Sequence, residues 1–290
     1  MRGSIPSPGA RTRAFGGNTS CVELRCGEQL LIFDLGSGAR ALGEMLRARG
    51  EPASAAIFLS HYHYDHLQGL PFFSPMFDAR NHFIIRGPTR GERDVQAILA
   101  GQMTPPYFPV TADEVFRARV EYQPIADGDV VELGDVQVRA LELHHPGGSL
   151  GYRVDYRGQS FVYATDIEHG SAVDGRLAVF AQGADVLVYD AMYTPEEYAG
   201  PPGKVGWGHS TWAAAVALAK AANVRTLVLF HHDPERDDIS MRLLERKAQR
   251  LFPGTVAARE GLPLDVDSPA RAVRPPRRAR SRRAPARKAR

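Results

Sequence analysis

Cysteine is scarce in this chain, which has two among its 290 residues. Cys21 and Cys26 lie in a stretch that is predicted to form a β-strand, where residues an odd number of positions apart face opposite sides. We therefore expect no disulfide between them. Neither belongs to a CxxC pair, so the sequence does not support a structural zinc site built on cysteine.

Long apolar runs are also missing. No stretch approaches the roughly 20 apolar residues that a membrane-spanning helix needs, so we expect no membrane segment. Residues 1–13 contain arginine and proline but lack the apolar core of a secretory signal. The sequence therefore predicts a cytoplasmic location. No internal repeat of fixed period stands out, which argues against solenoid and propeller architectures.

The chain does have a core-forming composition and an uneven distribution of charge. Hydrophobic residues make up 43% and charged residues 24% of its 290 residues, which is enough for one large soluble domain. Nine Arg, one Lys and no acid lie in residues 268–290, so residues 1–267 carry a net charge of −7 within the total of +3. We predict one folded domain over residues 1–267 and a disordered basic tail over 268–290. The tail either binds nucleic-acid phosphates without sequence preference or has no partner.

Short apolar runs separated by turn residues predict many strands and a few helices. In the first half, strands are expected at residues 21–25, 29–35, 55–60, 82–86, 120–124, 136–143, 150–156 and 160–164, with a helix at 41–49. The second half adds strands at residues 184–189, 224–230 and 255–259 and helices at 211–222 and 237–252, with Ser210 as the predicted N-cap of the first helix. Residues 70–77 and 104–110 are aromatic and rich in proline, so loops are predicted there. This pattern favours two sheets packed face to face between layers of helices.

Four side chains that bind divalent metals follow the predicted strand at residues 55–60. The motif is His61-x-His63-x-Asp65-His66, and imidazole and carboxylate are groups that zinc, manganese and iron prefer. His61 and His63 are two residues apart, so in extended chain they point the same way. Asp65 and His66 come after the chain has turned, so they face a second point. This arrangement is typical of a centre that holds two metal ions.

Other predicted strands also end in residues that bind metals. His144 and His145 follow the strand at residues 136–143, Asp166 follows the strand at 160–164, and His231 and His232 follow the strand at 224–230. A single histidine after a strand is usually a surface or structural residue. Four strand ends of this kind in one chain favour a shared pocket. At this point either member of each histidine pair can be the ligand.

These motifs resemble those of the metallo-β-lactamase superfamily. The matching features are the His61-to-His66 motif, a histidine before Pro-Gly-Gly, and strands that end in an aspartate and in a histidine. Four further segments are similar to the phosphodiesterase branch, which includes tRNase Z and the phosphoribosyl cyclic phosphate phosphodiesterases. They are Asn18-Thr-Ser-Cys, Asp34-Leu-Gly-Ser-Gly, His145-Pro-Gly-Gly-Ser-Leu-Gly-Tyr and Gly208-His-Ser-Thr. The resemblance spans roughly residues 2–261 and implies an α+β fold, a four-layer αββα sandwich.

The resemblance also implies a role for each metal-binding side chain. Two divalent ions, Zn²⁺ in the first instance with Mn²⁺ or Fe²⁺ as alternatives, would flank the hydroxide that attacks the substrate. His145 is preferred over His144 because it directly precedes Pro-Gly-Gly, and His231 over His232 because it comes first after its strand. Asp34 would brace the histidine loop from behind, or else it is an ordinary turn residue. The ligand set is His61, His63 and His145 for the first ion, Asp65, His66 and His231 for the second, and Asp166 as a bridge.

A further histidine, His209, resembles the residue that contacts the scissile phosphate in the phosphodiesterase branch and helps the leaving oxygen depart. Asp190, after the strand at residues 184–189, takes the place of its acidic partner, which is usually Glu in tRNase Z. A carboxylate fixes the imidazole tautomer and favours the protonated form, which can donate to a leaving alkoxide. The resemblance therefore makes His209, Asp190 and Asp65 the catalytic candidates. The alternative for His209 is a helix-capping residue, and His82 and His169 fit no motif and are expected to be structural or exposed.

The chain departs from these relatives at three points. It begins at Met1-Arg-Gly-Ser, where relatives usually have a strand before Arg-Gly-Ser. Either that strand is missing, which would leave a sheet edge open, or the true start lies upstream of Met1. Only one hairpin fits between His145 and Asp166, so the long arm with which tRNase Z grips tRNA is not in its usual place. The zinc-binding cysteines of some cyclic phosphate phosphodiesterases are also absent.

These features favour a metal-dependent phosphodiesterase whose substrate is a small or cyclic phosphodiester or an RNA end. The aromatic stretches at residues 70–77 and 107–109 either wall the pocket and stack on a base or sugar, or belong to the core. The main alternative is hydrolysis of a carboxylic ester, thioester or lactam on the same fold. A less favoured alternative is a non-catalytic protein that binds nucleic acid through its basic tail. Members of the superfamily are often dimers, which makes a homodimer a further expectation.

Overall fold

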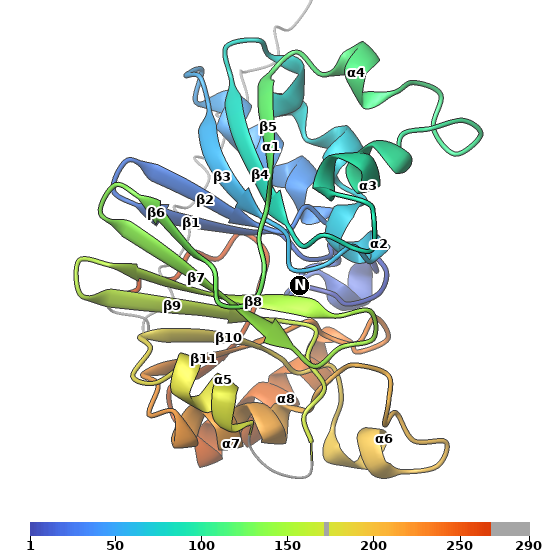
Figure 1. Cartoon of the computed structure of the whole chain (residues 1–290). Helices are drawn as coiled ribbons and strands as arrows, with labels where there is room; N and C mark the ends of the chain where they lie inside the picture. The colour runs from blue at the N-terminus through green and yellow to red at the C-terminus, as the bar shows by residue number, and fades with distance from the viewer. Residues whose placement is uncertain (171–173, 268–290) are drawn as a thin grey trace, which may run out of the picture.

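Strands from the first half of the chain form one sheet, as Figure 1 shows for the computed structural model of the protein. The structure describes residues 1–170 and 174–267, so the predicted basic tail lies outside the described residues. The strand order is β1-β2-β3-β4-β5, in which β1 and β2 pair antiparallel and the other neighbours pair parallel. The bounds are β1 Val22–Cys26, β2 Gln29–Phe33, β3 Ser54–Phe58, β4 His82–Gly87 and β5 Arg119–Pro124.

The later strands form a second sheet in the order β12-β11-β10-β9-β8-β7-β6. Strands β6 to β9 pair antiparallel and β9 to β12 pair parallel. Arg157 and Gly158, with φ of 48° and 80°, make a tight turn between β8 and β9, because positive φ at both positions matches the twist of hairpin strands. The bounds are β6 Val130–Leu133, β7 Val136–Leu143, β8 Ser149–Tyr156, β9 Gln159–Ala164, β10 Val186–Asp190, β11 Thr226–Phe230 and β12 Thr255–Ala257.

Helices cover the outer face of each sheet (Figure 1). Helix α1 packs on the first sheet, whereas α5, α7 and α8 pack on the second. The α-helices are α1 Gly38–Ala48, α2 Tyr64–Leu67, α3 Val95–Gly101, α4 Ala112–Val115, α5 Gly175–Phe180, α6 Pro195–Ala199, α7 Trp212–Ala221 and α8 Asp238–Leu251. The 3-10 helices are η1 Ala10–Thr12, η2 Leu70–Phe72 and η3 Ser74–Phe77.

A layer of aromatic side chains holds the two sheets face to face. Phe33 and Phe58 of the first sheet meet Tyr152 and Tyr163 of the second, with ring centroids 5.3–5.7 Å apart. All four side chains are fully buried. Burial of a large apolar side chain contributes ~1.5–3 kcal/mol, so this layer is a main source of the packing between the sheets.

The layers confirm the predicted αββα sandwich, and a few local predictions were wrong. Thr211, not Ser210, is the N-cap of α7, since its side chain accepts a hydrogen bond from the N–H of Ala214. Residues 70–77 form η2 and η3 rather than a loop. Strand β6 and helices α3 to α6 were not predicted, because elements of 4–7 residues carry too little periodic pattern.

The first three residues lie beside the carboxyl end of β11. The N–H of Arg2 donates to the carbonyl oxygen of Asn18 at 2.8 Å, and the N–H of Gly3 donates to that of His232 at 2.9 Å. Strand β1 ends the first sheet, with β2 as its sole strand partner within residues 1–170 and 174–267. Among the described helices none combines the length and the apolar character that crossing a membrane requires.

Candidate metal centre

Several strands end at the same edge of the sandwich, and the loops after them carry the site residues. Strands β9, β10 and β11 are parallel neighbours, and β7 runs in the same direction because β8 lies antiparallel between it and β9. Strand β3 of the first sheet ends at Phe58, directly before the histidine motif. Open sheets commonly bind ligands at the carboxyl ends of their parallel strands.

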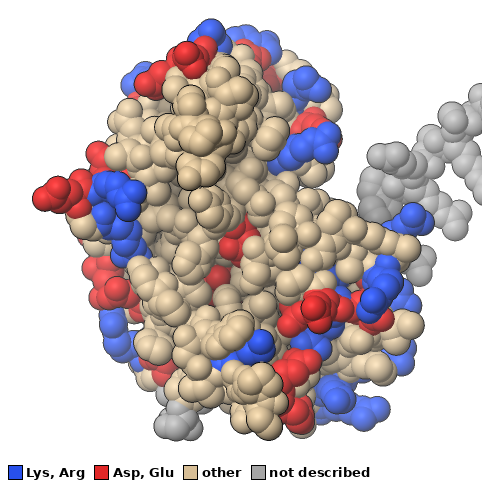
Figure 2. Space-filling view, turned by 90° about the vertical axis from the view of Figure 1, so that its right-hand side faces the viewer, with Lys and Arg blue, Asp and Glu red and all other residues tan. Residues whose placement is uncertain are grey.

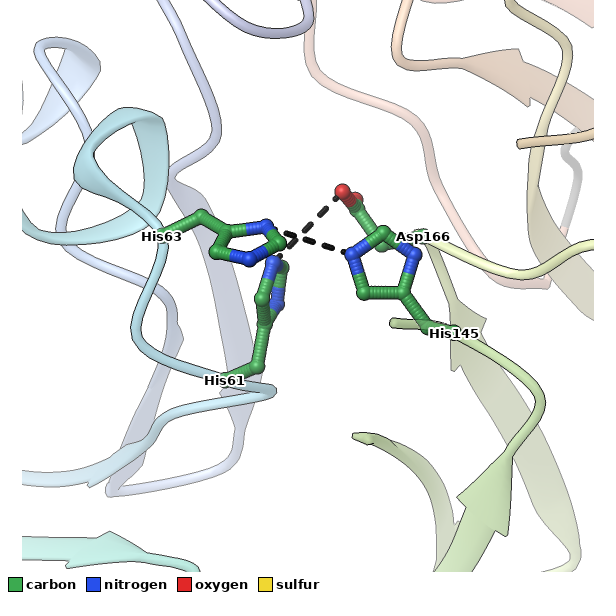
Figure 3. Close-up of side chains that lie close together, drawn as sticks. All are labelled: His61, His63, His145 and Asp166. Carbon is green, nitrogen blue, oxygen red and sulfur yellow. Dashed lines mark hydrogen bonds and ion pairs between the residues drawn. The ribbon is translucent and has the colours of Figure 1, made fainter. Parts of the chain in front are cut away.

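The first cluster joins both sheets at this edge. Nε2 of His61 lies 3.7 Å from Oδ2 of Asp166, and Nε2 of His145 lies 3.2 Å from Nδ1 of His63. In Figure 3 the two histidines of the β3 loop face His145 and Asp166, which come from the loops after β7 and β9. One ligand atom from each of the four side chains lies within 4.8 Å of the others. The predicted first set of ligands is therefore assembled in the fold.

The second cluster shares Asp166 with the first. Its Oδ1 lies 3.2 Å from Nε2 of His66 and 3.3 Å from Nε2 of His231. Oδ2 of Asp65 lies 3.3 Å and 3.1 Å from the same two nitrogens. All four side chains are buried. Because its two oxygens face different clusters, Asp166 occupies the position of the predicted bridge.

The two clusters fit divalent cations. Asp65 and Asp166 are buried beside several imidazoles, and burial of an ionised carboxylate is costly unless an opposite charge compensates it. Nε2 of His61 is buried without a hydrogen-bond partner among the described residues, and Nε2 of His66 lies near the carboxylate oxygens of Asp65 and Asp166 without forming a hydrogen bond of good geometry. Buried polar atoms are normally satisfied, so these nitrogens fit the ligands of a bound cation. A cation satisfies both the nitrogens and the carboxylates.

Two members of the clusters have their metal-binding protonation states. Burial, with His66 acting in the same direction, lowers the pKa of His61 well below its usual value, so this imidazole is neutral. Burial alone would raise the pKa of Asp166, but the charges of His231 and His66 lower it well below the usual carboxyl value. A neutral imidazole and an ionised carboxylate are the forms that bind metals.

Asp34 braces the second cluster from behind. Its Oδ2 accepts hydrogen bonds from Nδ1 of His66 and from the hydroxyl of Tyr163, both at 2.8 Å, and its Oδ1 accepts from the N–H of Ser60 at 2.8 Å. Because Nδ1 of His66 is engaged, Nε2 is left to face the cluster. Ser60 and Tyr163 were missed in the sequence, since serine and tyrosine are ordinary strand residues and no motif singles them out.

The structure distinguishes the two members of each histidine pair. Nδ1 of His145 donates to the carbonyl oxygen of Gly208 at 2.7 Å, which leaves its Nε2 toward the first cluster. His144 is exposed and belongs to neither cluster. His231 lies in the second cluster, whereas Nε2 of His232 contacts a backbone carbonyl oxygen at 3.2 Å. The preferred histidine of each pair is the one that lies in a cluster.

His209 lies at the edge of the second cluster. Its Nδ1 is 2.9 Å from Oδ2 of Asp190, and its ring stacks on that of His231 with centroids 4.8 Å apart. Although aspartate is shorter than glutamate, the fully buried Asp190 reaches the imidazole and also accepts from the N–H of Ser210 at 3.2 Å. Burial alone would lower the pKa of His209, but the charge and hydrogen bond of Asp190 raise it to about 9. The imidazole is therefore protonated at neutral pH.

The remaining two histidines lie outside the metal-ligand groups. Nε2 of His82 is 3.0 Å from a carboxylate oxygen of Glu121 across β4 and β5. Nδ1 of His169 is 2.9 Å from the hydroxyl of Ser210. Both positions agree with the expectation that these residues are structural or exposed.

A cavity of about 350 Å³ opens onto both clusters. On the face shown in Figure 2, acidic atoms lie deep in a central hollow, and most residues around it are uncharged. The hollow gives a substrate access to the clusters from solvent. The residues that line the cavity are Ser4, Tyr62, His63, Tyr64, Asp65, Asp166 and His209.

Comparison with known families agrees with this geometry. The profile of the beta-lactamase superfamily domain matches residues 31–232, a span that covers most of the chain and contains every residue of the two clusters. The chain belongs to the metallo-β-lactamase superfamily. The resemblance inferred from the motifs is thereby confirmed.

Curated relatives and solved structures are similar to this chain over most of its length. Ribonuclease Z of Methanosarcina mazei is 27% identical over 311 aligned positions, which cover 91% of this chain and 95% of the relative. The human short-form tRNase Z has a TM-score of 0.61 at 20% identity and covers 92% of this chain and 96% of its own. A diphosphatase of the PhnP family has a TM-score of 0.60 at 20% identity and covers 85% and 84%. The two solved structures share the metallo-β-lactamase fold with this chain.

The aromatic stretches of this superfamily member divide between core and surface. Phe73 is fully buried, whereas Phe72 is 56% exposed and contacts Phe108 with ring centroids 6.1 Å apart. Neither stretch contributes to the lining of the cavity within the described residues. The aromatic walls are instead Tyr62 and Tyr64, which the histidine motif itself supplies. Their places between the predicted metal ligands were the signal that the sequence offered.

Proposed function

We propose that this chain is a metal-dependent phosphodiesterase that acts on an RNA end or on a small or cyclic phosphodiester. The observation that carries the proposal is the pair of His209 and Asp190, which borders the metal clusters and whose His209 lines the same cavity. Hydrolysis of a phosphodiester with an alkoxide leaving group requires a proton donor for the departing oxygen, and this pair supplies one. A thiolate departs without a proton, so hydrolysis of a thioester has no evident need for the pair.

The proposed cofactor is a pair of divalent cations, with zinc as the first choice. His61, His63 and His145 would hold one cation, and the side chains of the second cluster would hold the other, with Asp166 between them. When bound, two such ions lower the pKa of water toward neutrality and neutralise charge on the phosphoryl oxygens. Imidazole-rich ligand sets suit zinc, although manganese and iron accept the same groups.

His209 has the geometry of a general acid. Asp190 accepts the hydrogen on Nδ1, so Nε2 is the nitrogen that can donate a proton to a leaving oxygen. Cations in the clusters would lower the pKa of His209, and the buried carboxylate of Asp190 opposes that effect.

The substrate class follows from the relatives and from the cavity. Several relatives that match most of this chain are ribonucleases Z, which supports an RNA substrate. Tyr62 and Tyr64 line the cavity, and Tyr64 is 79% exposed, so a base or sugar can stack on it. Between His145 and Asp166 the chain forms the β8–β9 hairpin, which closes in a tight turn. This hairpin leaves no long arm for gripping a large folded RNA, which favours a short or single-stranded RNA end as the substrate.

A panel of substrates tests the proposal. Metal-loaded protein should hydrolyse at least one of an aryl phosphodiester, a 2′,3′- or 3′,5′-cyclic nucleotide and a precursor tRNA, and should leave a thioester intact. The same preparation of an Asp166→Asn variant serves as the control for contaminating enzymes. Rapid thioester or lactam turnover without phosphodiester turnover would overturn the assignment.

Two further features belong to the proposal. The basic residues 268–290 would hold RNA phosphates without sequence preference, and this contribution should weaken steeply as salt is raised.

A homodimer would match a common state of the superfamily. Light scattering of the full chain at several protein concentrations tests the dimer, with a monomer mass at all concentrations as the contrary result.

A further inference from the structure

A buried carboxylate next to the metal clusters is not used by the chemistry above. Glu168 follows Asp166 by two residues and is 6% exposed, and it has no ion pair with a lysine or arginine among the described residues. Its Oε1 accepts hydrogen bonds from the N–H of Gly206 at 2.5 Å and from the hydroxyl of Tyr198 at 2.7 Å. Its Oε2 accepts from the N–H of Gly208 at 2.8 Å. Both oxygens therefore hold the segment that directly precedes His209.

Gly208 connects Glu168 to both halves of the site. Its N–H is bound by Glu168, its carbonyl oxygen accepts from Nδ1 of His145 at 2.7 Å, and the next residue is His209. Its φ of +81° lies in the left-handed region, and a Cβ at this position would collide with the ring of His145 and with Pro146. Glycine is the residue that fits such a position, so small movements of this backbone are transmitted to both histidines.

The backbone of Glu168 also bonds to the turn that carries His145. Its N–H donates to the carbonyl oxygen of His144 at 2.8 Å. The residue thus contacts the turn that carries His145 through its main chain and the loop that carries His209 through its side chain.

We propose that Glu168 is a positioning residue that sets His145 at the first metal and His209 at the leaving oxygen through its hold on Gly208. The part that concerns His209 rests on the proposed phosphodiesterase function. The part that concerns His145 depends on metal binding alone.

A carboxylate is required at this position because all three partners are donors. An ionised carboxylate only accepts hydrogen bonds, whereas a glutamine presents one oxygen and one NH₂ group. In Glu168→Gln, the NH₂ group must face either Gly208 or the pair formed by Gly206 and Tyr198. A donor then opposes the N–H of Gly208 or that of Gly206, which costs free energy and displaces the loop without changing the shape of the side chain.

The test compares leaving groups in Glu168→Gln. A nitrophenolate departs without a proton, whereas the alkoxide of a dinucleotide needs one, so only the dinucleotide depends on the placement of His209. We expect kcat to fall at least ~10-fold more for a dinucleotide than for bis(p-nitrophenyl) phosphate, with a smaller change in KM. In competition with a chelator, the variant should also bind Zn²⁺ ~10–100-fold more weakly, the range for residues that orient a metal ligand.

Glu245→Gln is the matched control. Glu245 is also buried, and it accepts hydrogen bonds from the N–H of Ala257 at 2.9 Å and from Arg259 at 2.6 Å, on helix α8 at the outer face of the second sheet. The substitution should lower the thermal stability but leave the ratio of the two kcat values and the Zn²⁺ affinity unchanged.

The outcomes separate the inference from the proposed function. The positioning role would be overturned if Glu168→Gln kept the kcat ratio and the Zn²⁺ affinity of the wild type. It would also be overturned if Glu245→Gln changed both quantities as much as Glu168→Gln does. If the wild-type protein cleaves neither diester, the proposed function fails, and the chelator competition still decides whether Glu168 orients His145. Circular dichroism of each variant confirms that the compared proteins are folded.

Discussion

The two sides of the site are held in place in different ways. On the β3 side, the histidine motif follows a buried strand, and Asp34 fixes His66 from within the core between the sheets. On the other side, His209 lies on a loop between α6 and α7 whose backbone is bound by the carboxylate of Glu168. The first side is supported by strands and several buried partners, whereas the second depends on a few hydrogen bonds to one side chain.

This difference matches the different roles proposed for the two sides, which are metal binding on the β3 side and proton donation on the His209 side. Metal ligands must keep a fixed geometry to compensate the charges of two buried carboxylates, and strand ends provide that geometry. The proposed proton donor, His209, lies on a loop, and a loop can be adjusted in sequence without disturbing the sheets. Substitutions on the β3 side should therefore affect metal binding first, whereas those on the His209 side should also change the ratio of dinucleotide to aryl-diester turnover.

The largest effect is expected at the shared ligand. Asp166→Asn removes the charge that both clusters use, so the bound metal content should drop and turnover should fall by more than the ~10²–10⁴-fold that a general acid contributes. Elemental analysis and diester turnover, measured on the same sample, check this. A variant that keeps its metals and its rate would remove Asp166 from the centre.

The next effect separates the two sides. His209→Ala should leave the metal content unchanged and reduce kcat for a dinucleotide by ~10²–10⁴-fold, because the leaving alkoxide no longer receives a proton. An aryl diester should be affected much less. Equal rates for wild type and variant on the dinucleotide would reassign His209 to a structural role.

Asp34→Asn tests the β3 side in the same manner. The amide can no longer satisfy His66, Tyr163 and Ser60 together, so Zn²⁺ affinity should fall ~10–100-fold. Chelator competition measures the affinity, and the ratio of dinucleotide to aryl turnover at saturating metal should stay that of the wild type. A changed ratio would mean that the two sides are not independent.

A smaller effect is expected in the pH profile of Asp190→Asn. The carboxylate raises the pKa of His209, and the protonated form would be the active acid, so turnover should be lost as the pH rises through the pKa of His209. Replacing the carboxylate by an amide lowers the pKa, so the alkaline limb of kcat should move to lower pH. A limb at the same pH in both proteins would separate Asp190 from the titration of His209.

The smallest effect on turnover is expected from removal of residues 268–290. Residues 1–267 contain all cluster residues, so hydrolysis of a small diester should change less than ~2-fold, since the deletion touches no group near the metals. RNA binding at low salt should weaken, because ten positive charges are lost. A collapse of small-diester turnover would assign the tail to the fold or to the site.

The metal clusters were predictable because their ligands combine two strong local signals. His61 and Asp166 each follow an apolar strand, and the side-chain type restricts the chemistry once several such strands occur together. The αββα layers followed from the same strands. The sequence could also rank His145 above His144, since the neighbouring Pro-Gly-Gly defines the turn.

What the sequence could not show lies in long-range contacts. Glu168 looks like any acid in a loop, and its function depends on Gly206 and Gly208, which are about 40 positions away. The face that helix α8 buries is a second example of what the sequence could not show. The helical spacing of its apolar residues was evident, yet Ile239 and Leu243 are 70% and 54% exposed because Met241 and Leu244 take the core positions. Such outcomes depend on which neighbours pack together, and spacing alone does not contain that information.

The metal content of the purified full chain tests the central claim most directly. Elemental analysis of protein that was never exposed to chelators should give about two divalent cations per chain, and their removal should abolish diester hydrolysis until Zn²⁺ is restored. A folded chain that hydrolyses diesters at an undiminished rate without any divalent cation would contradict the account.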